Sequence, residues 1–270
     1  MRAIFAAGVL HAFGTDGFDP FDLYIGVSAG ACHLASHLAG QNDRNFDITL
    51  RYSMAPEFIS PWRFFKGGHL MDLDWMWHQT ITHYRLNLKQ IDEKLRTQSK
   101  QYLIVATSVA SGRPLYLRPD EKTLEHYLKV SSSLPLLYRN ILEAGGEKAT
   151  DGGIADSIPV REACRLGATD ITVIRSRTAR YFKKTGSTAL LIFSWYFRKY
   201  PRLVEAFRKR AENYNASVAF IKSPPPGIRV TEVAPPAYLA IGRTTRDEAP
   251  LRAAYETGIV RGESFMKSRK

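Results

Sequence analysis

Apolar residues occur along the chain in short blocks whose spacing predicts alternating helices and strands. In residues 3–13 the apolar positions recur with the period of an amphipathic helix. The continuous apolar run at 21–27 is typical of a buried strand, and the alanine-rich stretch after it indicates a second helix. The chain therefore begins with a helix, a strand and a helix in close succession.

The same alternation continues to about residue 177. We expect further helices at 88–95, 121–130 and 160–166, and strands at 102–107, 114–117, 147–150 and 171–174. The Ser111-Gly112 pair predicts a turn that joins two of these strands. Strands that alternate with helices favour an α/β domain with a mostly parallel sheet. A chain of 270 residues with 44% hydrophobic content buries a full core, so one domain over 1–270 is expected.

Residues 45–83 depart from this pattern. They are irregular and rich in aromatic residues, with Gly67-Gly68 near the middle. Such a segment is more typical of a cap over a pocket than of a strand in a sheet.

A serine lies between two glycines where the first strand meets the second helix, in the pattern Gly26-x-Ser28-x-Gly30. At such a turn the serine hydroxyl stands clear of both elements, and the glycines let the backbone turn tightly. The following helix directs its unpaired N–H groups and its positive dipole end at the serine, where an oxyanion would develop. The pattern predicts a nucleophile elbow. The alternative is a glycine-rich packing turn with a capping serine.

A nucleophilic serine needs a group that accepts its proton. All seven histidines lie at or before residue 126, so the order of serine, acid and late histidine found in α/β-hydrolases does not fit. His126 with Asp120 stays open, although a histidine on a helix is more often a surface residue. Asp151 is the stronger candidate, because a short strand would place its carboxylate in a tight loop with Gly152 and Gly153. An ordinary Asp-Gly turn is the other interpretation.

These motifs, in this order, resemble the patatin-like phospholipases, in particular their bacterial branch. Gly26-Val27-Ser28-Ala29-Gly30 and Asp151-Gly152-Gly153 carry the resemblance, together with residues 132–135 and 158–160. The resemblance covers residues 1–177 and implies a three-layer α/β/α fold with a mostly parallel sheet. It also implies a phospholipase A or lysophospholipase that uses Ser28 as nucleophile and Asp151 as general base, without a metal or another cofactor.

The family's glycine-rich oxyanion segment is the main departure. In the family this segment ends in x-Arg-Gly just before the first helix and supplies backbone donors. Arg2 matches the arginine and Ala3 replaces the last glycine, while the preceding glycines and strand are absent from this chain. The amide of Ala29 remains as one donor, and losing a donor typically costs about 10² to 10³ in rate. We expect an upstream start that restores the segment. The alternative is a weakened or inactive lipid-binding relative.

Basic residues exceed acidic ones by 12, and the excess is concentrated between residues 175 and 210. Aromatic residues interleave with them, a combination that suits contact with an anionic membrane. We expect this contact through about 181–210. These residues belong to a C-terminal part at about 178–270, which is expected to hold a basic and aromatic helical segment followed by strands and a helix. The side chains expected at the interface and on the head groups are Phe193, Trp195, Tyr196, Phe197, Arg198, Lys199 and Arg202.

The basic segment has two other interpretations. Its apolar block at 189–193 argues against a nucleic-acid groove, so no nucleic-acid partner is expected. A partly buried helix with a solvated basic face remains the alternative to membrane contact.

The two cysteines and the chain start bear on location. Cys32 and Cys164 lie in apolar helical patterns, which favours buried thiols in a reducing compartment, and no metal-ligand spacing involves them. The first apolar run ends at His11 without a small-x-small site, so it is interpreted as a helix and not as a secretion signal. No stretch approaches the roughly 18 apolar residues of a membrane span. We expect a cytoplasmic protein that is peripheral on the inner face of the membrane.

Overall fold

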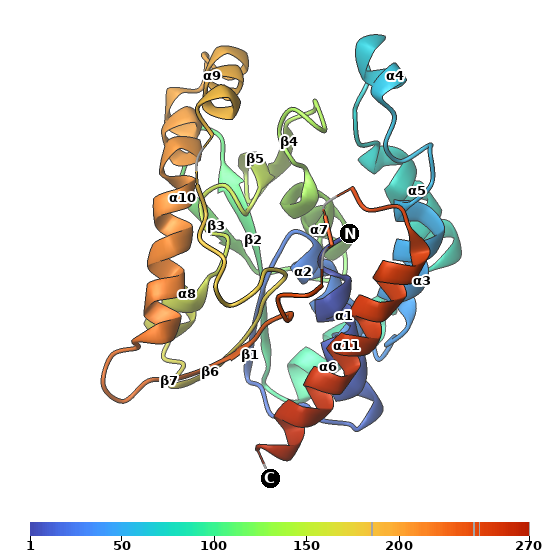
Figure 1. Ribbon diagram of the computed structural model, residues 1–270, viewed down its shortest axis with the longest axis vertical. Coiled ribbons are helices and arrows are strands. Elements are labelled where there is room, and N and C mark those ends of the chain that lie inside the picture. Colours follow the sequence, from blue (N-terminus) through green and yellow to red (C-terminus); the bar gives the residue numbers. More distant parts are fainter. Residues whose placement is uncertain (185, 240, 243, 270) are drawn as a thin grey trace.

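The computed structural model describes residues 1–184, 186–239, 241–242 and 244–269 (Figure 1). Its strands are β1 (Leu23–Val27), β2 (Gln101–Ser108), β3 (Pro114–Leu117), β4 (Leu142–Ala144), β5 (Glu147–Asp151), β6 (Asp170–Ile174) and β7 (Arg229–Val233). Its helices are α1 (Ile4–Thr15), α2 (Ala29–Leu38), α3 (Arg44–Ile48), a π-helical turn (Thr49–Ser53), α4 (Pro61–Phe65), α5 (Leu73–His83), α6 (Leu88–Thr97), α7 (Leu124–Ser132), α8 (Val160–Arg165), α9 (Ser187–Tyr196), α10 (Pro201–Lys222) and α11 (Glu248–Lys267).

The larger sheet has the strand order β1-β2-β5-β4, with β3 paired to β2. β1 is parallel to β2, with Val27 opposite Val105, and β5 is antiparallel to β2, with Asp151 opposite Ala106. β6 and β7 form a separate parallel pair. The α/β class predicted from the sequence is confirmed. The larger sheet is mixed, since β3 and β5 run antiparallel to β2 and β4 runs antiparallel to β5.

The central strand β2 explains the layered arrangement. Residues 102–108 are all buried, so both faces of this strand must be covered. Figure 1 shows α8 and α10 on one side of the strands and α1, α2 and α11 on the other. Helices therefore cover both sides of the strands, as in a layered α/β fold.

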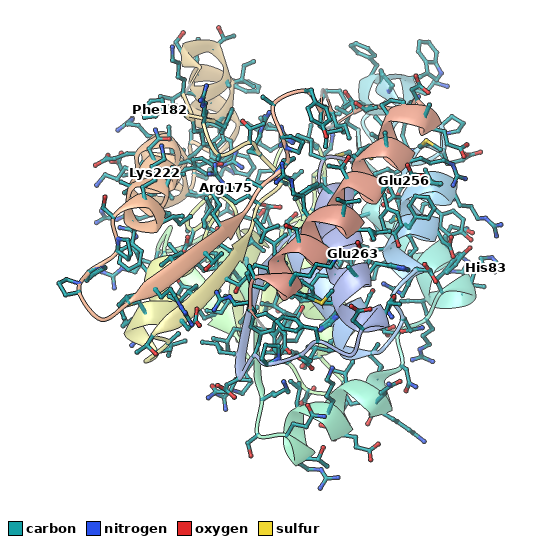
Figure 2. All side chains as sticks on the ribbon, turned by 60° about the horizontal axis from the view of Figure 1, so that its bottom comes forward. His83, Arg175, Phe182, Lys222, Glu256 and Glu263 are labelled. Carbon is teal, nitrogen blue, oxygen red and sulfur yellow. The ribbon has the colours of Figure 1, made fainter. Side chains whose placement is uncertain are left out.

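The first helix lies against the last one (Figures 1 and 2). Glycines permit the close approach: a Cβ on Gly8 would lie 2.0 Å from the carbonyl oxygen of Tyr255, and one on Gly258 would lie 2.2 Å from that of Phe5. Residues 4–10, 12 and 13 of α1 are buried. The helix that the sequence predicted as amphipathic is therefore a core helix, because α11 covers its second face.

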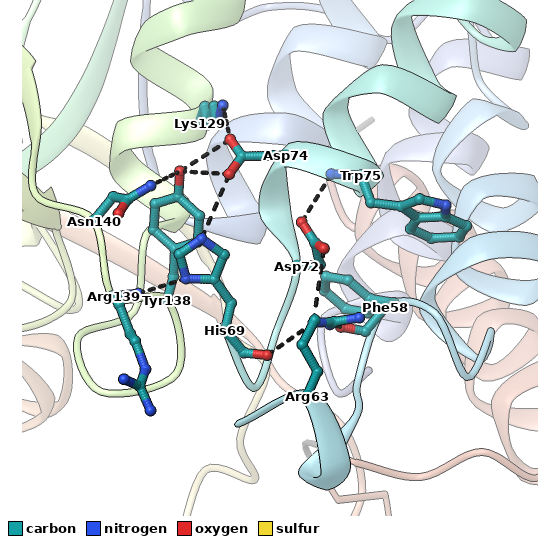
Figure 3. Close-up of polar contacts among 10 residues, drawn as sticks. All are labelled: Phe58, Arg63, His69, Asp72, Asp74, Trp75, Lys129, Tyr138, Arg139 and Asn140. Carbon is teal, nitrogen blue, oxygen red and sulfur yellow. Dashed lines mark hydrogen bonds and ion pairs between the residues drawn. The ribbon is translucent and has the colours of Figure 1, made fainter. Parts of the chain in front are cut away.

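The cap, residues 45–83, folds into α3, the π-helical turn, α4 and α5. A network of polar contacts fastens it to the chain segment before β4 (Figure 3). Asp74 of α5 accepts a hydrogen bond from the Tyr138 hydroxyl at 3.0 Å and pairs with Lys129 at 2.5 Å. Nδ1 of His69 accepts the backbone N–H of Arg139 at 3.0 Å.

Asp74 is the centre of this network. Burial raises the pKa of its carboxyl, but the bonds from Lys129 and Tyr138 outweigh burial and leave the pKa lowered. A carboxylate at this position therefore stays charged and holds α5 in place near neutral pH.

Helix α9 corrects one expectation from the sequence. Phe193 and Phe197 are 1% and 5% exposed, and Phe193 stacks on Phe207 of α10 with ring centroids 3.9 Å apart. The expectation that these two rings insert at a membrane interface is wrong, because positions four apart share the helix face that packs on α10. Leu191 and Trp195 lie on the other side and are 71% and 68% exposed. In the described ranges, no helix is long and apolar enough to cross a membrane.

Candidate active site

Ser28 lies between β1 and α2 at a strained backbone position. Its φ is +54° and its ψ is −127°, a combination that is rare for a residue with a side chain. The turn is tight because Gly26 has no side chain: a Cβ there would lie 2.4 Å from the Cα of Ala31. A Cβ on Gly30 would meet no atom within 4 Å, so the space beside the serine is open. A turn of this shape holds the serine side chain at its tip.

The backbone amide of Ser28 is held by a second serine. It donates to Oγ of Ser131 at 2.8 Å, and that hydroxyl donates to the carbonyl oxygen of Val105 on β2 at 2.6 Å. The amides of Ala29 and Gly30 belong to the first turn of α2, where a helix has no acceptor of its own for them. They are therefore the donors, reinforced by the helix dipole, that this site offers to an oxyanion.

Asp151 lies at the end of β5, across β2 from the serine. Because Val27 faces Val105 and Asp151 faces Ala106, one strand separates the two candidates, and their backbones lie about 10 Å apart. The side chain is nearly sealed from solvent, since Asp151 is 2% exposed. Its Oδ1 accepts the backbone N–H of Gly153 at 2.9 Å, which fixes the carboxylate within the Asp-Gly-Gly loop.

Both side chains line one cavity of about 640 Å³. Its wall combines β1 and β6 with the cap and α10. The cap contributes apolar side chains, among them Leu73, Met76 and Trp77. In the described part of the chain, β1 pairs with β2 alone and β6 with β7 alone, so two strand edges face this space. Their backbone N–H and C=O groups add polar positions to an otherwise largely apolar wall.

Of the other candidate site residues predicted from the sequence, some line this cavity and others do not. Arg2, Ala29 and Gly153 line the same cavity as the candidate pair. Gly152 instead packs on β2, where a Cβ would lie 2.1 Å from the carbonyl oxygen of Val105.

The histidine alternative finds no support. His126 is exposed on α7, and its Nε2 lies 2.6 Å from the carbonyl oxygen of Glu143. Asp120 accepts the backbone N–H of Thr123 at 2.8 Å. Neither residue is among those that line the cavity around Ser28.

Three residues near the site have no signal in the sequence. Ser131 was one of three consecutive serines, and nothing local marks it as the partner of the elbow. His33 lies on α2, lines the cavity and is 6% exposed. Arg210 of α10 donates from Nε to the carbonyl oxygen of Gly153 at 2.6 Å. The fold brings these residues to the site from other parts of the chain or other faces of a helix, so their positions become visible only in the folded molecule.

Comparison with known proteins decides the family. A family model described as "Patatin-like phospholipase" matches residues 1–164, which contain both the elbow and the Asp-Gly-Gly loop. The chain belongs to the patatin-like phospholipase family. Members of this family are lipid acyl hydrolases, so the predicted fold and the predicted general activity are confirmed at the level of the family.

Two further matches extend beyond the patatin-like region. The chain is 33% identical over 276 residues to the uncharacterized protein YjjU of Escherichia coli K12, an alignment that covers 98% of this chain and 74% of that protein. Residues 200–270 match a second family model, described as "Domain of unknown function (DUF6363)". The segment that includes α10, β7 and α11 is thus recognised in other proteins without an assigned role.

No metal site accompanies this patatin-like arrangement in the parts of the chain that the structure describes. There, no group of three His, Cys, Asp or Glu side chains is placed to hold a metal ion. Cys32 and Cys164 are free thiols.

Proposed function

We propose that this protein is a serine lipid acyl hydrolase of the phospholipase A or lysophospholipase type, with Ser28 and Asp151 as its catalytic dyad. One observation carries the proposal: a serine at a strained strand-to-helix turn and a buried aspartate one strand away line the same cavity. The apolar wall from the cap suits an acyl chain.

The reaction needs no group beyond those in the cavity. Oγ of Ser28 attacks the ester carbonyl carbon while its proton passes to Asp151, and the oxyanion is held by the first amides of α2. The tetrahedral intermediate releases the alcohol, which takes the proton from Asp151. Water then attacks the acyl-enzyme and gives a proton to Asp151. Release of the fatty acid returns that proton to Ser28.

An active-site-directed fluorophosphonate tests the nucleophile. Oγ of an activated serine displaces fluoride and forms a phosphonate ester, which intact-mass spectrometry detects. We expect one label per chain and loss of labelling in Ser28→Ala. The matched control is Ser53→Ala, because Ser53 lines the same cavity. Labelling that survives in Ser28→Ala would exclude the elbow as the reactive site.

The base is tested by Asp151→Asn with a soluble short-chain ester. We expect a fall in kcat of at least about 10²-fold, because the amide cannot accept the serine proton. Asp156→Asn is the control, since Asp156 lies in the same loop but accepts the Tyr116 hydroxyl at 2.8 Å. Folding is checked by circular dichroism. A protein that binds lipid vesicles but neither labels nor hydrolyses esters would be the non-catalytic relative.

We also propose that α9 contacts an anionic membrane. Leu191 and Trp195 project from it, and the guanidinium of Arg198 lies 5.4 Å from the Trp195 ring. Helix α4 lies at the same end of the molecule (Figure 1) and exposes Trp62 and Phe65 at 69% and 81%. Exposed aromatic rings beside cations are suited to the interface of anionic lipid.

A further inference from the structure

Helix α10 packs directly on the loop that follows β5. This loop begins with Asp151 and the two glycines, and the side chain of its Ile154 is buried in one cluster with Leu203 and Ala206 of α10. α10 belongs to residues 200–270, the region that matches a family model without an assigned role. The contact therefore connects that region to the proposed general base.

Arg210 interrupts the buried stripe of α10. Ala206 and Tyr214, four residues to either side of it, are both buried, so position 210 lies on the face of the helix that packs inward. Nε of Arg210 donates to the carbonyl oxygen of Gly153 at 2.6 Å, and Nδ2 of Asn213 donates to a second carbonyl oxygen of the loop at 3.4 Å. A guanidinium on such a face is costly to desolvate, and a charge-assisted hydrogen bond offsets part of that cost.

The backbone of Gly153 links Arg210 to Asp151. Its N–H donates to Oδ1 of Asp151 at 2.9 Å, while its carbonyl oxygen accepts from Arg210 and also from Oγ of Ser157 at 2.7 Å. Two consecutive glycines leave this part of the chain more conformational freedom than other residues would. The bonds to the carbonyl oxygen restrict that freedom, so they also fix the amide that orients the carboxylate.

The guanidinium of Arg210 also brings a positive charge close to this carboxylate. A Cβ built on Gly153 would lie 3.0 Å from Oδ1 of Asp151 and 3.7 Å from Nη2 of Arg210, so both groups lie beside the same glycine. Asp151 is 2% exposed, and burial by itself favours the protonated form of a carboxyl group. A neighbouring cation favours the ionised form, which is the form that accepts a proton.

We propose that Arg210 is a positioning residue for the general base: it holds the Asp-Gly-Gly loop through Gly153 and favours the ionised form of Asp151. This inference rests on the proposed function and gives the C-terminal region a part in it through α10. Arg210 also lines the cavity, so the alternative is that it contacts the substrate directly. The two roles differ in their kinetic consequences, because a positioning residue acts only through Asp151.

The first test measures hydrolysis of a soluble short-chain ester by Arg210→Gln and Arg210→Lys. Removing the charge with glutamine should lower kcat about 10- to 100-fold, the value of one charge-assisted hydrogen bond, and leave KM within about twofold. Lysine keeps the charge and should retain most of the rate. Arg208→Gln is the matched control, since Arg208 is exposed on the same helix and pairs with Glu205. A rise in KM at unchanged kcat would instead assign Arg210 to the substrate and overturn the proposal.

A double-mutant cycle separates action through Asp151 from any other effect. In the Asp151→Asn background, Arg210→Gln should change the residual kcat by less than about threefold, because the carboxylate that it positions is already absent. A general loss of packing would instead lower the rate equally in both backgrounds. Additive losses in the double variant would therefore refute the positioning role.

Hydrogen exchange followed by mass spectrometry distinguishes failure of this inference from failure of the proposed function. Arg210→Gln should speed exchange in peptides that cover residues 152–156, and Arg208→Gln should not. This measurement needs no turnover, so it tests the contact even in a protein that hydrolyses no ester. If Asp151→Asn keeps full activity, the proposed dyad fails. If Asp151→Asn is inactive while Arg210→Gln matches the unaltered protein in kinetics and exchange, only the positioning role fails.

Discussion

Burial of the single residue His33 makes the stability of the folded protein depend on pH. The side chain is 6% exposed, and burial lowers its pKa to about 4. In the unfolded chain a histidine titrates near 6.5, so below that pH the unfolded state takes up a proton that the folded state refuses. The stability associated with neutral His33 is therefore complete above pH 6.5 and is lost as the pH falls toward 4.

The first prediction is that the protein loses stability as the pH falls. Between pH 7 and pH 4 we expect the free energy of unfolding to fall by up to about 3 kcal/mol through this residue. Urea titrations across this range should show a shallower pH dependence for His33→Gln than for the unaltered protein. His78→Gln is the control, since His78 is exposed on α5. If both variants keep the full pH dependence, other groups cause it.

A site residue could be predicted from the sequence only where its immediate sequence neighbours mark it. Ser28 and Asp151 stand within short motifs, because a tight turn needs glycine as an immediate neighbour. Ser131 and Arg210 contact those motifs directly but lie 103 and 57 residues away from them along the chain, and a lone serine or arginine has no distinctive neighbours in the sequence. Local patterns therefore predict the two proposed catalytic residues, while the residues that hold them in place can be identified only from the fold.

At the scale of elements, hydrophobic periodicity predicted most of the helices and strands in the N-terminal two-thirds of the chain. β1, β2, β3, β5, β6 and the helices around them lie close to their expected positions. Helix α9 was harder, because nearly all of its residues are apolar and no polar stripe marks the exposed face. The hairpin of β4 with β5 was missed. It is short, and its turn relies on the positive φ of Gly145 and Gly146.

The exposed face of α9 makes a prediction for this element. Trp195→Ala should weaken binding to phosphatidylglycerol vesicles by about 10-fold, because the ring no longer enters the interface. Co-sedimentation should also weaken with salt, and neutral vesicles should bind little. Since Trp195 is 68% exposed, the substitution should change the free energy of unfolding of the protein by less than about 0.5 kcal/mol.

Two control variants define how this result is interpreted. Leu166→Ala removes an exposed apolar side chain from the end of α8, away from α9 in Figure 1, and should leave vesicle binding intact. Phe193→Ala should destabilise the protein by about 3–5 kcal/mol, because its ring is packed on α10. Unfolding of Trp195→Ala would instead assign the whole helix to the core.

At the scale of the whole molecule, we propose that residues 1–270 fold as one unit. The helix pair α1 and α11 joins the patatin-like region to the C-terminal region through backbone contact at Gly8 and Gly258. A glycine in a helix is normally less favourable than alanine by about 1 kcal/mol, so Gly→Ala would usually stabilise. Here the close packing of α1 on α11 leaves no room for a methyl group, so Gly→Ala should destabilise the protein.

Gly258→Ala is therefore expected to lower the free energy of unfolding by about 1–3 kcal/mol, despite the better helix propensity of alanine. Chemical denaturation measures the change. Glu256→Ala serves as control: Glu256 is exposed on α11, so this substitution should cost less than about 0.5 kcal/mol. A stabilised Gly258→Ala protein would show that the two helices separate easily.

The pairing of the first helix with the last has a consequence for biosynthesis. α1 is buried on nearly all sides, and much of that cover comes from α11. On a growing polypeptide, α1 leaves the ribosome long before α11 is synthesised, so its apolar residues stay uncovered until then. The same holds for the loop of Asp151, which Arg210 fastens only once α10 has emerged. A nascent chain of this protein therefore exposes the apolar residues of α1 until α11 has been synthesised, and the loop of Asp151 reaches its folded form only after α10 has emerged.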